Sequence, residues 1–476
     1  MASFLSRLSL RASLSRCRVP YGGASRASSR IWFSSDVKES SDPETKDEES
    51  TLKIDRSGLS QLQDHAPKIS GRESMSAMSK HLDAIIRFRG GPIPVAEYME
   101  EVLTNPTAGF YMNRDVFGAG GDFVTSPDIS QMFGELIGVW STCLWHQMGR
   151  PKEVALVELG PGRGTLMADL IRGTSKFQDF TSAISIHLVE CSPTLRKIQE
   201  ATLECVSCDD CPEKKRSTLS GSLVSWYMDL LEVPRGVPTI IIAHEFFDAL
   251  PVHQFQKTPR GWCEKLIDVG ESPSEPFRYV LSPRPTPASK LYLGKRLQWA
   301  SEEEKACLEH VEVCPESFRY AGSISRRVSE DGGAALIIDY GDDKIITDSL
   351  QAIRKHKFTS VLDDPGSADL SAHVDFGAIR HAATEAAADG VTVYGPITQS
   401  KFLGMLGINF RLEALLNNAS EEQAEALQLG YWRLVGEGPA PWVEGEEDES
   451  TQTGMGTQYK ALAIVNSSLG VPIGFQ

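Results

Sequence analysis

The stretch VALVELGPGRGT, residues 154–165, constrains the fold of this chain more than any other. A short run of apolar β-formers leads into Gly160, Gly162 and Gly164, and the amphipathic stretch LMADLIR follows. This order predicts a buried strand, a tight turn and then a helix with Thr165 as its N-cap. Glycine tolerates positive φ and lets a ligand approach bare backbone, while a helix N-terminus offers unpaired N–H groups to an anionic group. The stretch therefore predicts a binding site for a nucleotide-like cofactor.

The spacing of the glycines distinguishes between such cofactors. The pyrophosphate fingerprint is G-x-G-x-x-G, whereas this chain has E-x-G-x-G-x-G, with Glu158 as the acid. The second pattern is the glycine loop of methyltransferases that use S-adenosylmethionine (SAM), which carries an amino-acid carboxylate and no phosphate. A second acid should end the next strand and bind the ribose hydroxyls, and SAISIHLVE ends in Glu190. The sequence thus favours SAM over NAD. The cofactor residues expected here are Glu158, Gly160, Gly162, Gly164 and Glu190.

Composition narrows the functional classes. The 476 residues are 41% hydrophobic and carry a formal net charge of −16, so one elaborated domain or two can form. The acidic excess argues against a nucleic-acid partner, and no apolar run reaches the roughly 18 residues of a membrane span. Nine scattered cysteines fit a reducing interior. The cluster CVSCDDC (Cys205, Cys208 and Cys211) has no nearby fourth ligand, so we expect no metal.

The N-terminal region differs in composition from the rest. Residues 1–35 contain six arginines and many serines, and no acidic residue precedes Asp36. Such an Arg- and Ser-rich, acid-poor and amphipathic segment is typical of a mitochondrial transit peptide. A disordered basic tail and a chloroplast address are the alternatives. Residues 36–75 are acidic and polar, which predicts a disordered linker.

Helices are expected to dominate residues 76–150. HLDAIIRFRG and PIPVAEYMEEVLTN predict two helices, and a third should begin near Ser130. We expect these helices to form an N-terminal cap. The glycine-rich loop GGDFVTSPD between them carries Thr125 and Ser126, which we expect to close over the cofactor.

Five apolar runs alternate with helical segments in the rest of the chain. Each run ends in an acid, namely Glu158, Glu190, Asp229, Glu245 or Asp339. This alternation predicts a doubly wound α/β sheet, and the acids should gather at its carboxyl edge, with Asp229 near the adenine. The predicted fold is a Rossmann-like SAM-dependent methyltransferase core over residues 151–470. Inserted segments are expected at about 203–220 and 255–330, the latter with a β-hairpin (GWCEKLIDVG and FRYVLSP) and a largely helical excursion over 285–330.

The turn HEFFDALP, residues 244–251, follows the fourth strand. Methyl transfer depends mainly on positioning and on charge, and the carboxylates of Glu245 and Asp248 suit a cationic acceptor such as a guanidinium. His244 or a carboxylate could take the proton that the acceptor loses. The alternative is that Glu245 and Asp248 only cap the turn. His373 and Asp375 fit a helix start better than a catalytic pair, although they could line the acceptor entrance.

Six stretches together resemble one known family. They are GDFVTSPDISQMFGE, VELGPGRGTLMADLIR, HLVECSPTLRKIQ, IIAHEFFDALPVHQF, IDYG and ADLSAHVDF. In this order, over roughly residues 78–466, they resemble the blocks of the MidA family of mitochondrial arginine methyltransferases, which are assembly factors for respiratory complex I. The resemblance implies a matrix enzyme that symmetrically dimethylates an arginine on the 49-kDa-type core subunit of complex I. It leaves a homodimer open.

The resemblance also assigns site residues. It places the SAM loop at the three glycines, the ribose acid at Glu190 and the acceptor turn at 245–251. His244 stands where many bacterial members have Asn. Two alternatives stay open: a SAM methyltransferase acting on a small molecule, and an assembly chaperone that binds SAM without catalysis. A narrow apolar acceptor cavity would favour the first, whereas loss of the Glu245 turn would favour the second.

Overall fold

The computed structural model describes residues 75–112, 125–208, 213–272, 274–440 and 453–476. These residues belong to one compact unit, Ile69–Gln476. The expected transit peptide and, apart from Met75, the expected linker lie outside the described residues, as does most of the loop before Thr125.

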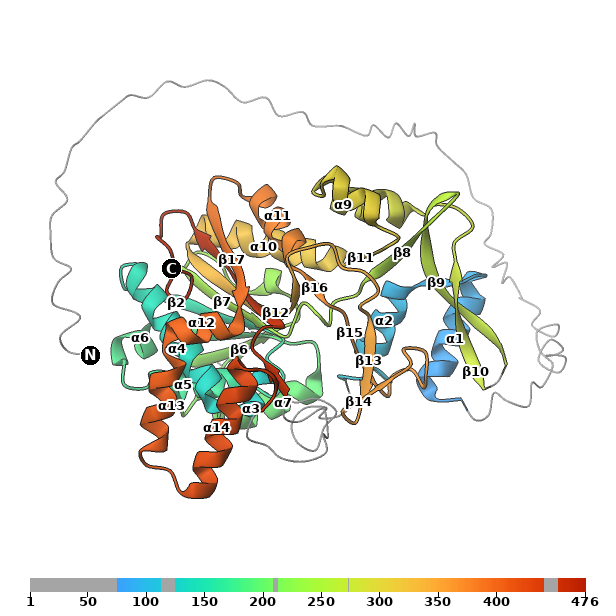
Figure 1. The fold of residues 1–476 in the computed structure, drawn as a ribbon. Coiled ribbons are helices and arrows are strands. Elements are labelled where there is room, and N and C mark those ends of the chain that lie inside the picture. The colour runs from blue at the N-terminus through green and yellow to red at the C-terminus, as the bar shows by residue number, and fades with distance from the viewer. Residues whose placement is uncertain (1–74, 113–124, 209–212, 273, 441–452) are drawn as a thin grey trace, which may run out of the picture. The chain divides into compact units, whose positions relative to one another are not determined.

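Among the described residues, a ten-stranded sheet forms the centre of this unit (Figure 1). Its parallel strands lie in the order β6-β3-β2-β7-β12, which is the 3-2-1-4-5 order of a Rossmann sheet. The predicted doubly wound core is therefore confirmed, and each predicted apolar run forms one of these strands. They are β2 (Val154–Leu159), β3 (Ile184–Val189), β6 (Leu223–Tyr227), β7 (Thr239–His244) and β12 (Gly333–Asp342).

Antiparallel strands extend the parallel core at both edges. β20 (Tyr459–Asn466) runs antiparallel between β12 and β17 (Val391–Thr398). At the other edge, β5 (Lys215–Ser217) and β4 (Cys205–Ser207) continue the sheet from β6. Two short segments of the predicted insertion at 203–220 therefore belong to the sheet. Strands of three residues show too little alternation of polar and apolar residues to be recognised from sequence.

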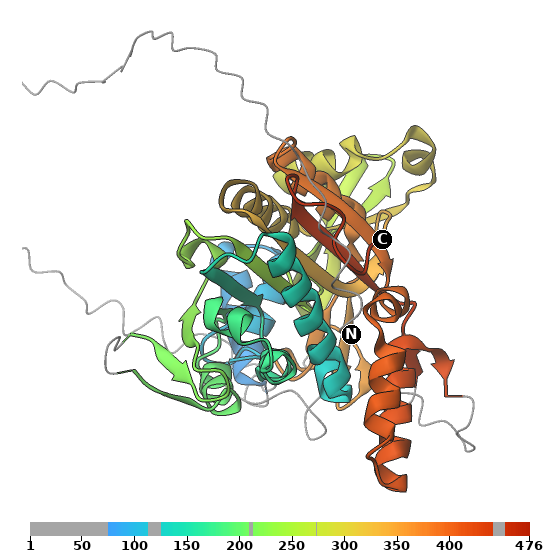
Figure 2. The ribbon, with the colours of Figure 1, turned by 90° about the vertical axis from the view of Figure 1, so that its left-hand side faces the viewer.

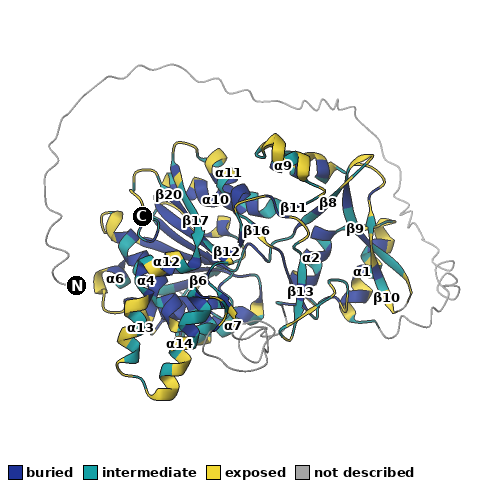
Figure 3. Cartoon of the chain, in the orientation of Figure 1, coloured by how far each residue is buried: buried dark blue, intermediate teal, exposed yellow. Residues whose placement is uncertain are grey.

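Helices cover both faces of the sheet because its strands are apolar on both sides. Leu156 and Ile240 belong to one apolar cluster with α4 and α5. Val157 and Ile241 belong to a second cluster with α10 and α11. Figure 3 shows the strands as the most buried part of the chain. These helices are α4 (Gln131–Gln147), α5 (Thr165–Thr174), α10 (Pro315–Asp331) and α11 (Phe376–Ala386).

Two of these helices, α4 and α10, lie in positions that differ from those expected from the sequence. α4, assigned above to the cap, packs closely on α5. A Cβ added at Gly134 of α4 would lie only 2.5 Å from Cβ of Asp169 of α5. The domain division at residue 150 nevertheless stays a prediction. The segment 285–330 is largely helical, as expected. Its helix α10 is not an excursion, since it covers one face of the sheet.

Two smaller sheets, one of five strands and one of three, and two N-terminal helices lie at the right of Figure 1 and contribute to another apolar cluster. Tyr98 of α2 packs there with Ile267 of β9 and Phe277 of β10. The predicted hairpin is confirmed, since β9 and β10 are antiparallel neighbours. The elements here are α1 (Ala77–Arg89), β1 (Ile93–Pro94), α2 (Val95–Thr104), β8 (His253–Thr258), β9 (Gly261–Ser272), β10 (Glu275–Leu281), β11 (His310–Val313), β13 (Gln351–Arg354), β14 (Lys357–Thr359) and β15 (Asp369–Ser371).

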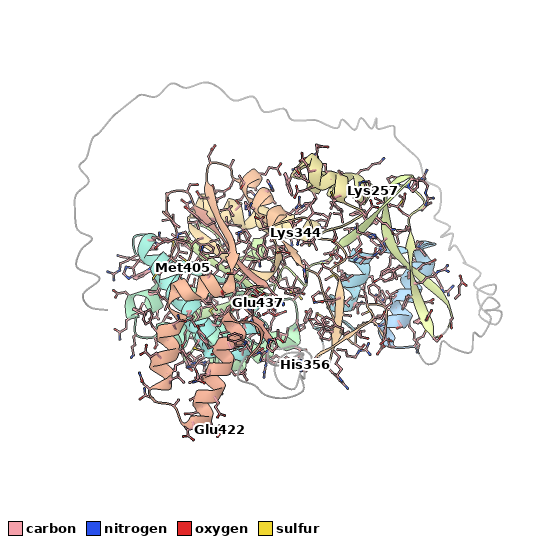
Figure 4. All side chains as sticks on the ribbon, in the orientation of Figure 1. Lys257, Lys344, His356, Met405, Glu422 and Glu437 are labelled. Carbon is pink, nitrogen blue, oxygen red and sulfur yellow. The ribbon has the colours of Figure 1, made fainter. Side chains whose placement is uncertain are left out.

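A helical hairpin, α13 (Ile408–Leu416) and α14 (Glu421–Val435), projects from the sheet in both views (Figures 1 and 2). Figure 4 labels Glu422 at its tip. No described helix is long and apolar enough to cross a membrane. The remaining elements are α3 (Ser126–Ile129), α6 (Gln178–Ala183), α7 (Pro193–Thr202), η2 (Leu230–Glu232), η3 (Ser289–Leu293), α8 (Gly294–Gln298), α9 (Glu302–Cys307), β16 (Val374–Asp375), α12 (Gln399–Leu406), β18 (Glu437–Pro439) and β19 (Thr453–Met455).

Candidate active site

A cavity opens at the carboxyl ends of β2 and β7, which are neighbours in the sheet but not in the chain. The strand order reverses at this point, and open α/β sheets bind ligands there. The cavity volume is about 170 Å³, against roughly 10–15 Å³ for one water molecule. The predicted site residues that line it are Thr125, Glu158, Gly160, Gly162, Glu190, His244, Glu245 and Asp248.

The glycine loop joins β2 to α5 along one side of the cavity. Gly160, Gly162 and Gly164 have φ values of 62°, 52° and 82°, in the left-handed region that residues with a side chain rarely adopt. At Gly160 a Cβ would also lie 2.9 Å from Cδ2 of Phe246. Gly164, rather than Thr165, is the N-cap of α5, because its carbonyl already accepts the first hydrogen bond of the helix.

Gln199 of α7 connects this loop to the second predicted acid. Its buried Nε2 donates to the carbonyl of Gly162 at 2.7 Å and to Oε2 of Glu190 at 3.0 Å. Its Oε1 accepts from Nε1 of Trp226 at 2.9 Å. Burial raises the pKa of Glu190, and its hydrogen bonds oppose that rise. The sequence analysis missed Gln199. The available signal was a polar side chain on the buried face of an amphipathic helix, where it needs partners.

Glu158 places a carboxyl group in the cavity from the end of β2. Its Oε2 is buried and has no hydrogen-bond partner among the described residues. Burial raises the pKa of this carboxyl to about 8. A buried carboxyl without a partner is costly, whereas a cationic ligand group nearby favours its charged form. The position therefore suits the positive end of a ligand.

Asp339 of β12 holds the turn that follows β7. Its Oδ2 accepts hydrogen bonds from the backbone N–H groups of residues 246–248 at 3.0–3.3 Å. Its Oδ1 accepts from its neighbour's backbone N–H at 2.9 Å. Burial and nearby Glu245 raise the pKa of Asp339, whereas the four N–H groups favour its charged form. Asp339 thus fixes the backbone of the acceptor turn.

Glu245 begins this turn with a φ of 49°, a conformation that costs energy in a residue other than glycine. Its side chain is 6% exposed, its Oε1 lies 3.2 Å from Nε2 of His244, and the backbone N–H of Ser126 donates to it at 3.4 Å. Burial, followed by the charge of Asp248, raises the pKa of Glu245 well above its usual value. Burial lowers the pKa of His244 to about 3, so the imidazole is neutral at physiological pH. A cationic ligand can therefore change the charge of Glu245, whereas His244 stays neutral.

Two further cavity residues, Asp369 and Tyr111, lie outside the Rossmann core. Asp369, at the start of β15, accepts a hydrogen bond from the Tyr111 hydroxyl at 2.6 Å. Asp248 is buried, and its Oδ1 has no hydrogen-bond partner among the described residues. Burial, and then Asp339 and Asp369, raise the pKa of Asp248 well above its usual value. Three carboxyl groups, those of Glu245, Asp248 and Asp369, therefore line one cavity.

Asp369 was not predicted as a site residue, although it stands in the stretch ADLSAHVDF, from which only His373 and Asp375 were named as candidates. In the structure, Asp375 caps α11 and pairs with Arg296, which supports the helix start. Neither residue lines the cavity at the ends of β2 and β7.

Known proteins resemble this chain over most of its length. A family described as "Putative S-adenosyl-L-methionine-dependent methyltransferase" matches residues 136–397. The chain belongs to this family. A mouse relative named protein arginine methyltransferase NDUFAF7, mitochondrial, is 46% identical, over 76% of this chain and 81% of its own. The fruit fly homologue of the same name is 43% identical, over 84% and 88% respectively.

A solved structure of the same fold comes from Burkholderia thailandensis and is bound to S-adenosyl-homocysteine. It has a TM-score of 0.66 and 23% identity, and the similarity covers 86% of this chain and 96% of that one. This likeness confirms the Rossmann-like fold of a SAM-dependent methyltransferase.

The cavity fits the cofactor of the family, SAM. The Oε2 of Glu158, which lacks a partner, matches the positively charged groups of SAM. A carboxylate accepts about four hydrogen bonds, so Glu190 can bind ribose hydroxyls in addition to the two donors that orient it. The positive-φ glycines leave the backbone of the loop open to a ligand. These residues would hold SAM.

Three of the predicted cofactor residues do not line the cavity. The carbonyl of Gly164 caps α5, and Ser126 donates its backbone N–H to Glu245. Asp229 lies two residues after β6 and caps η2, where its carboxylate accepts from the backbone N–H of Leu231 and pairs with Arg319 at 3.0 Å. Their roles in binding SAM remain predictions.

Proposed function

We propose that this chain is a SAM-dependent protein arginine N-methyltransferase of the mitochondrial matrix. Its proposed acceptor is an arginine on the 49-kDa-type core subunit of complex I, which it dimethylates symmetrically and thereby helps to assemble. The names of the mouse and fruit fly relatives support the acceptor residue and the mitochondrial location. The resemblance to the MidA family supports the subunit and the role in assembly.

The observation that carries the proposal is the acidic wall of the cavity. Glu245, Asp248 and Asp369 line the same cavity as the glycine loop. Buried carboxyl groups are costly unless a cation or hydrogen-bond donors compensate them. A guanidinium brings a permanent positive charge and five N–H donors in one plane. An arginine side chain therefore satisfies this wall better than a neutral or an apolar acceptor does.

The same residues account for the proton that the reaction releases. When bound, SAM supplies a methyl group on a positively charged sulfonium, where it is open to displacement. An acceptor guanidinium that gains this methyl group loses one proton from the same nitrogen. A cation next to Glu245 lowers its raised pKa, so Glu245 becomes the carboxylate that orients the nitrogen and takes the proton. We assign the positioning of that carboxylate to the neutral His244, whose Nε2 lies 3.2 Å away and has no hydrogen-bond partner among the described residues.

Labelled SAM, the purified mature protein and the unassembled core subunit test this function. We expect label on one arginine, located by mass spectrometry. Glu245→Gln should bind SAM normally but reduce the turnover number by about a hundredfold or more, the usual contribution of an acid–base group. Glu312→Gln is the matched control, since Glu312 is buried and hydrogen-bonded but does not line the cavity.

Two outcomes would contradict the proposal. Tight SAM binding without transfer to the subunit would favour the chaperone alternative. Normal transfer by Glu245→Gln would show that the acceptor turn is assigned wrongly. The proposed location has a separate test, since deletion of residues 1–35 should abolish import into isolated mitochondria and leave activity intact.

A further inference from the structure

We propose that Asp369, held by Tyr111, selects a guanidinium as the acceptor. This inference rests on the proposed arginine methyltransferase function. It assigns to two residues outside the Rossmann core a role in substrate specificity.

Asp369 reaches the cavity from a separate part of the chain. Glu245 and Asp248 belong to the turn after β7, whereas Asp369 begins β15, which pairs with β13 in a small sheet of its own. The backbone N–H of Ala372 donates to the carbonyl of Asp248 at 3.0 Å, so this sheet is fixed to the acceptor turn. Asp369 is 7% exposed and lines the cavity with both acids.

Tyr111 orients the carboxylate and connects it to the cofactor site. Its hydroxyl donates to Oδ1 of Asp369 at 2.6 Å. Its backbone carbonyl accepts a hydrogen bond from Oγ of Ser192 at 2.7 Å, and the backbone N–H of Ser192 donates to Glu190 at 2.8 Å. These three hydrogen bonds, joined through Ser192 and Tyr111, place Asp369 and the predicted ribose acid Glu190 on one framework. Burial raises the pKa of Tyr111 well above 10, so its hydroxyl stays a neutral donor.

The chemistry of the two basic side chains explains why a third carboxylate matters. An ammonium is a compact charge with three donors, which two carboxylates on one turn can neutralise. A guanidinium spreads its five N–H groups over a plane, so it presents donors to more than one wall of a cavity. A carboxylate on a separate element can meet those further donors. Asp369 is placed to be that carboxylate.

Steady-state kinetics on the core subunit, combined with calorimetry for SAM, test the inference. Asp369→Asn keeps the size and one acceptor oxygen, but it loses the charge and replaces the other oxygen with an NH2 donor. We expect it to raise the KM for the subunit about tenfold or more, because hydrogen bonds between charged partners are the strong ones. SAM affinity should not change. Tyr111→Phe should raise the KM by a smaller factor, and Asp369→Glu should restore part of the loss.

Tyr98→Phe is the matched control for Tyr111→Phe. Tyr98 also donates one buried hydroxyl hydrogen bond, to the carbonyl of Val361 at 2.7 Å, but does not line the cavity. Its loss should lower stability without changing the KM. If the wild-type protein is active and the KM is unchanged in both Asp369→Asn and Tyr111→Phe, this inference is wrong but the proposed function still stands. Absence of arginine methylation by the wild type, with SAM bound, would overturn the proposed function and this inference with it.

Discussion

The cavity has two halves that are built on different principles. The cofactor half is lined by Glu158, Gly160, Gly162 and Glu190, which Gln199 supports from outside the lining, and the acceptor half is lined by Glu245, Asp248 and Asp369. In the cofactor half, Gln199 uses its amide to join Gly162, Glu190 and Trp226 at 2.7–3.0 Å. In the acceptor half, Oδ1 of Asp248 lacks a partner and the pKa values of Glu245 and Asp248 are well above normal.

The difference between the halves reflects what each of them binds. The cofactor is the same in every turnover, so polar groups that position it gain from fixed hydrogen bonds within the protein. The acceptor brings its own charge and donors, and unsatisfied carboxyl groups gain most when such a ligand arrives. The acceptor half therefore bears the cost of buried carboxyl groups at both Glu245 and Asp248, whereas the cofactor half bears it mainly at Glu158. Glu158 is the exception, since it belongs to the cofactor half but lacks a partner.

Gly162→Val should have the largest effect on the cofactor half, because it should abolish SAM binding. Valine at a φ of 52° is strained, and its side chain would occupy the cavity at the glycine loop. We expect calorimetry to detect no SAM binding. Gly149→Val is the control, because Gly149 also has a positive φ of 83° but has open space around it and does not line the cavity. Unchanged affinity in Gly162→Val would show that the cofactor binds elsewhere.

Because the buried carboxyl of Glu158 lacks a partner among the described residues, we expect the affinity for SAM to depend on pH. Its carboxyl, with a pKa of about 8, is protonated at lower pH. The positive groups of SAM favour the charged form, so binding requires loss of that proton. SAM affinity should rise by up to about tenfold per pH unit between about pH 6 and 8 and then level off. Calorimetry across this range measures the slope. A slope that persists unchanged in Glu158→Gln would contradict the assignment.

Gln199→Leu should have the smallest effect of the three. It leaves the carbonyl of Gly162 and one oxygen of Glu190 without their shared donor, which should weaken SAM binding about three- to tenfold. The turnover number at saturating SAM should change little, because the acceptor half is untouched. Gln399→Leu removes a comparable buried amide, which bonds the carbonyl of Leu434 away from the cavity. Equal losses of affinity in both variants would indicate general destabilisation instead.

The cofactor half could be predicted from the sequence because its residues follow successive strands. The glycine pattern, Glu158 and Glu190 are local signals, since each stands at the end of an apolar run. The five parallel strands were predictable for the same reason. Gln199 was missed because a single buried amide in a helix has no pattern of its own, and its partners lie on three other elements.

The acceptor half was only partly predictable, since it depends on contacts between distant segments. Glu245 and Asp248 followed from their place after the fourth strand. Asp369 is separated from Tyr111 by more than half of the chain, and no local pattern connects them. The short strands β4 and β5 were missed because pairing with a neighbour, rather than their own composition, makes them strands. Pairing of this kind becomes evident only in three dimensions.

Asp339 holds the acceptor turn through backbone N–H groups, which are the same in every amino acid except proline. The shape of the turn is therefore largely independent of the side chains that it displays. Over evolutionary time, such a turn can exchange its side chains and keep its geometry, as an antibody framework does with its variable loops. Relatives that act on other acceptors would then differ at position 248 and share the aspartate beneath it. The same property makes this turn a practical place to redesign acceptor preference.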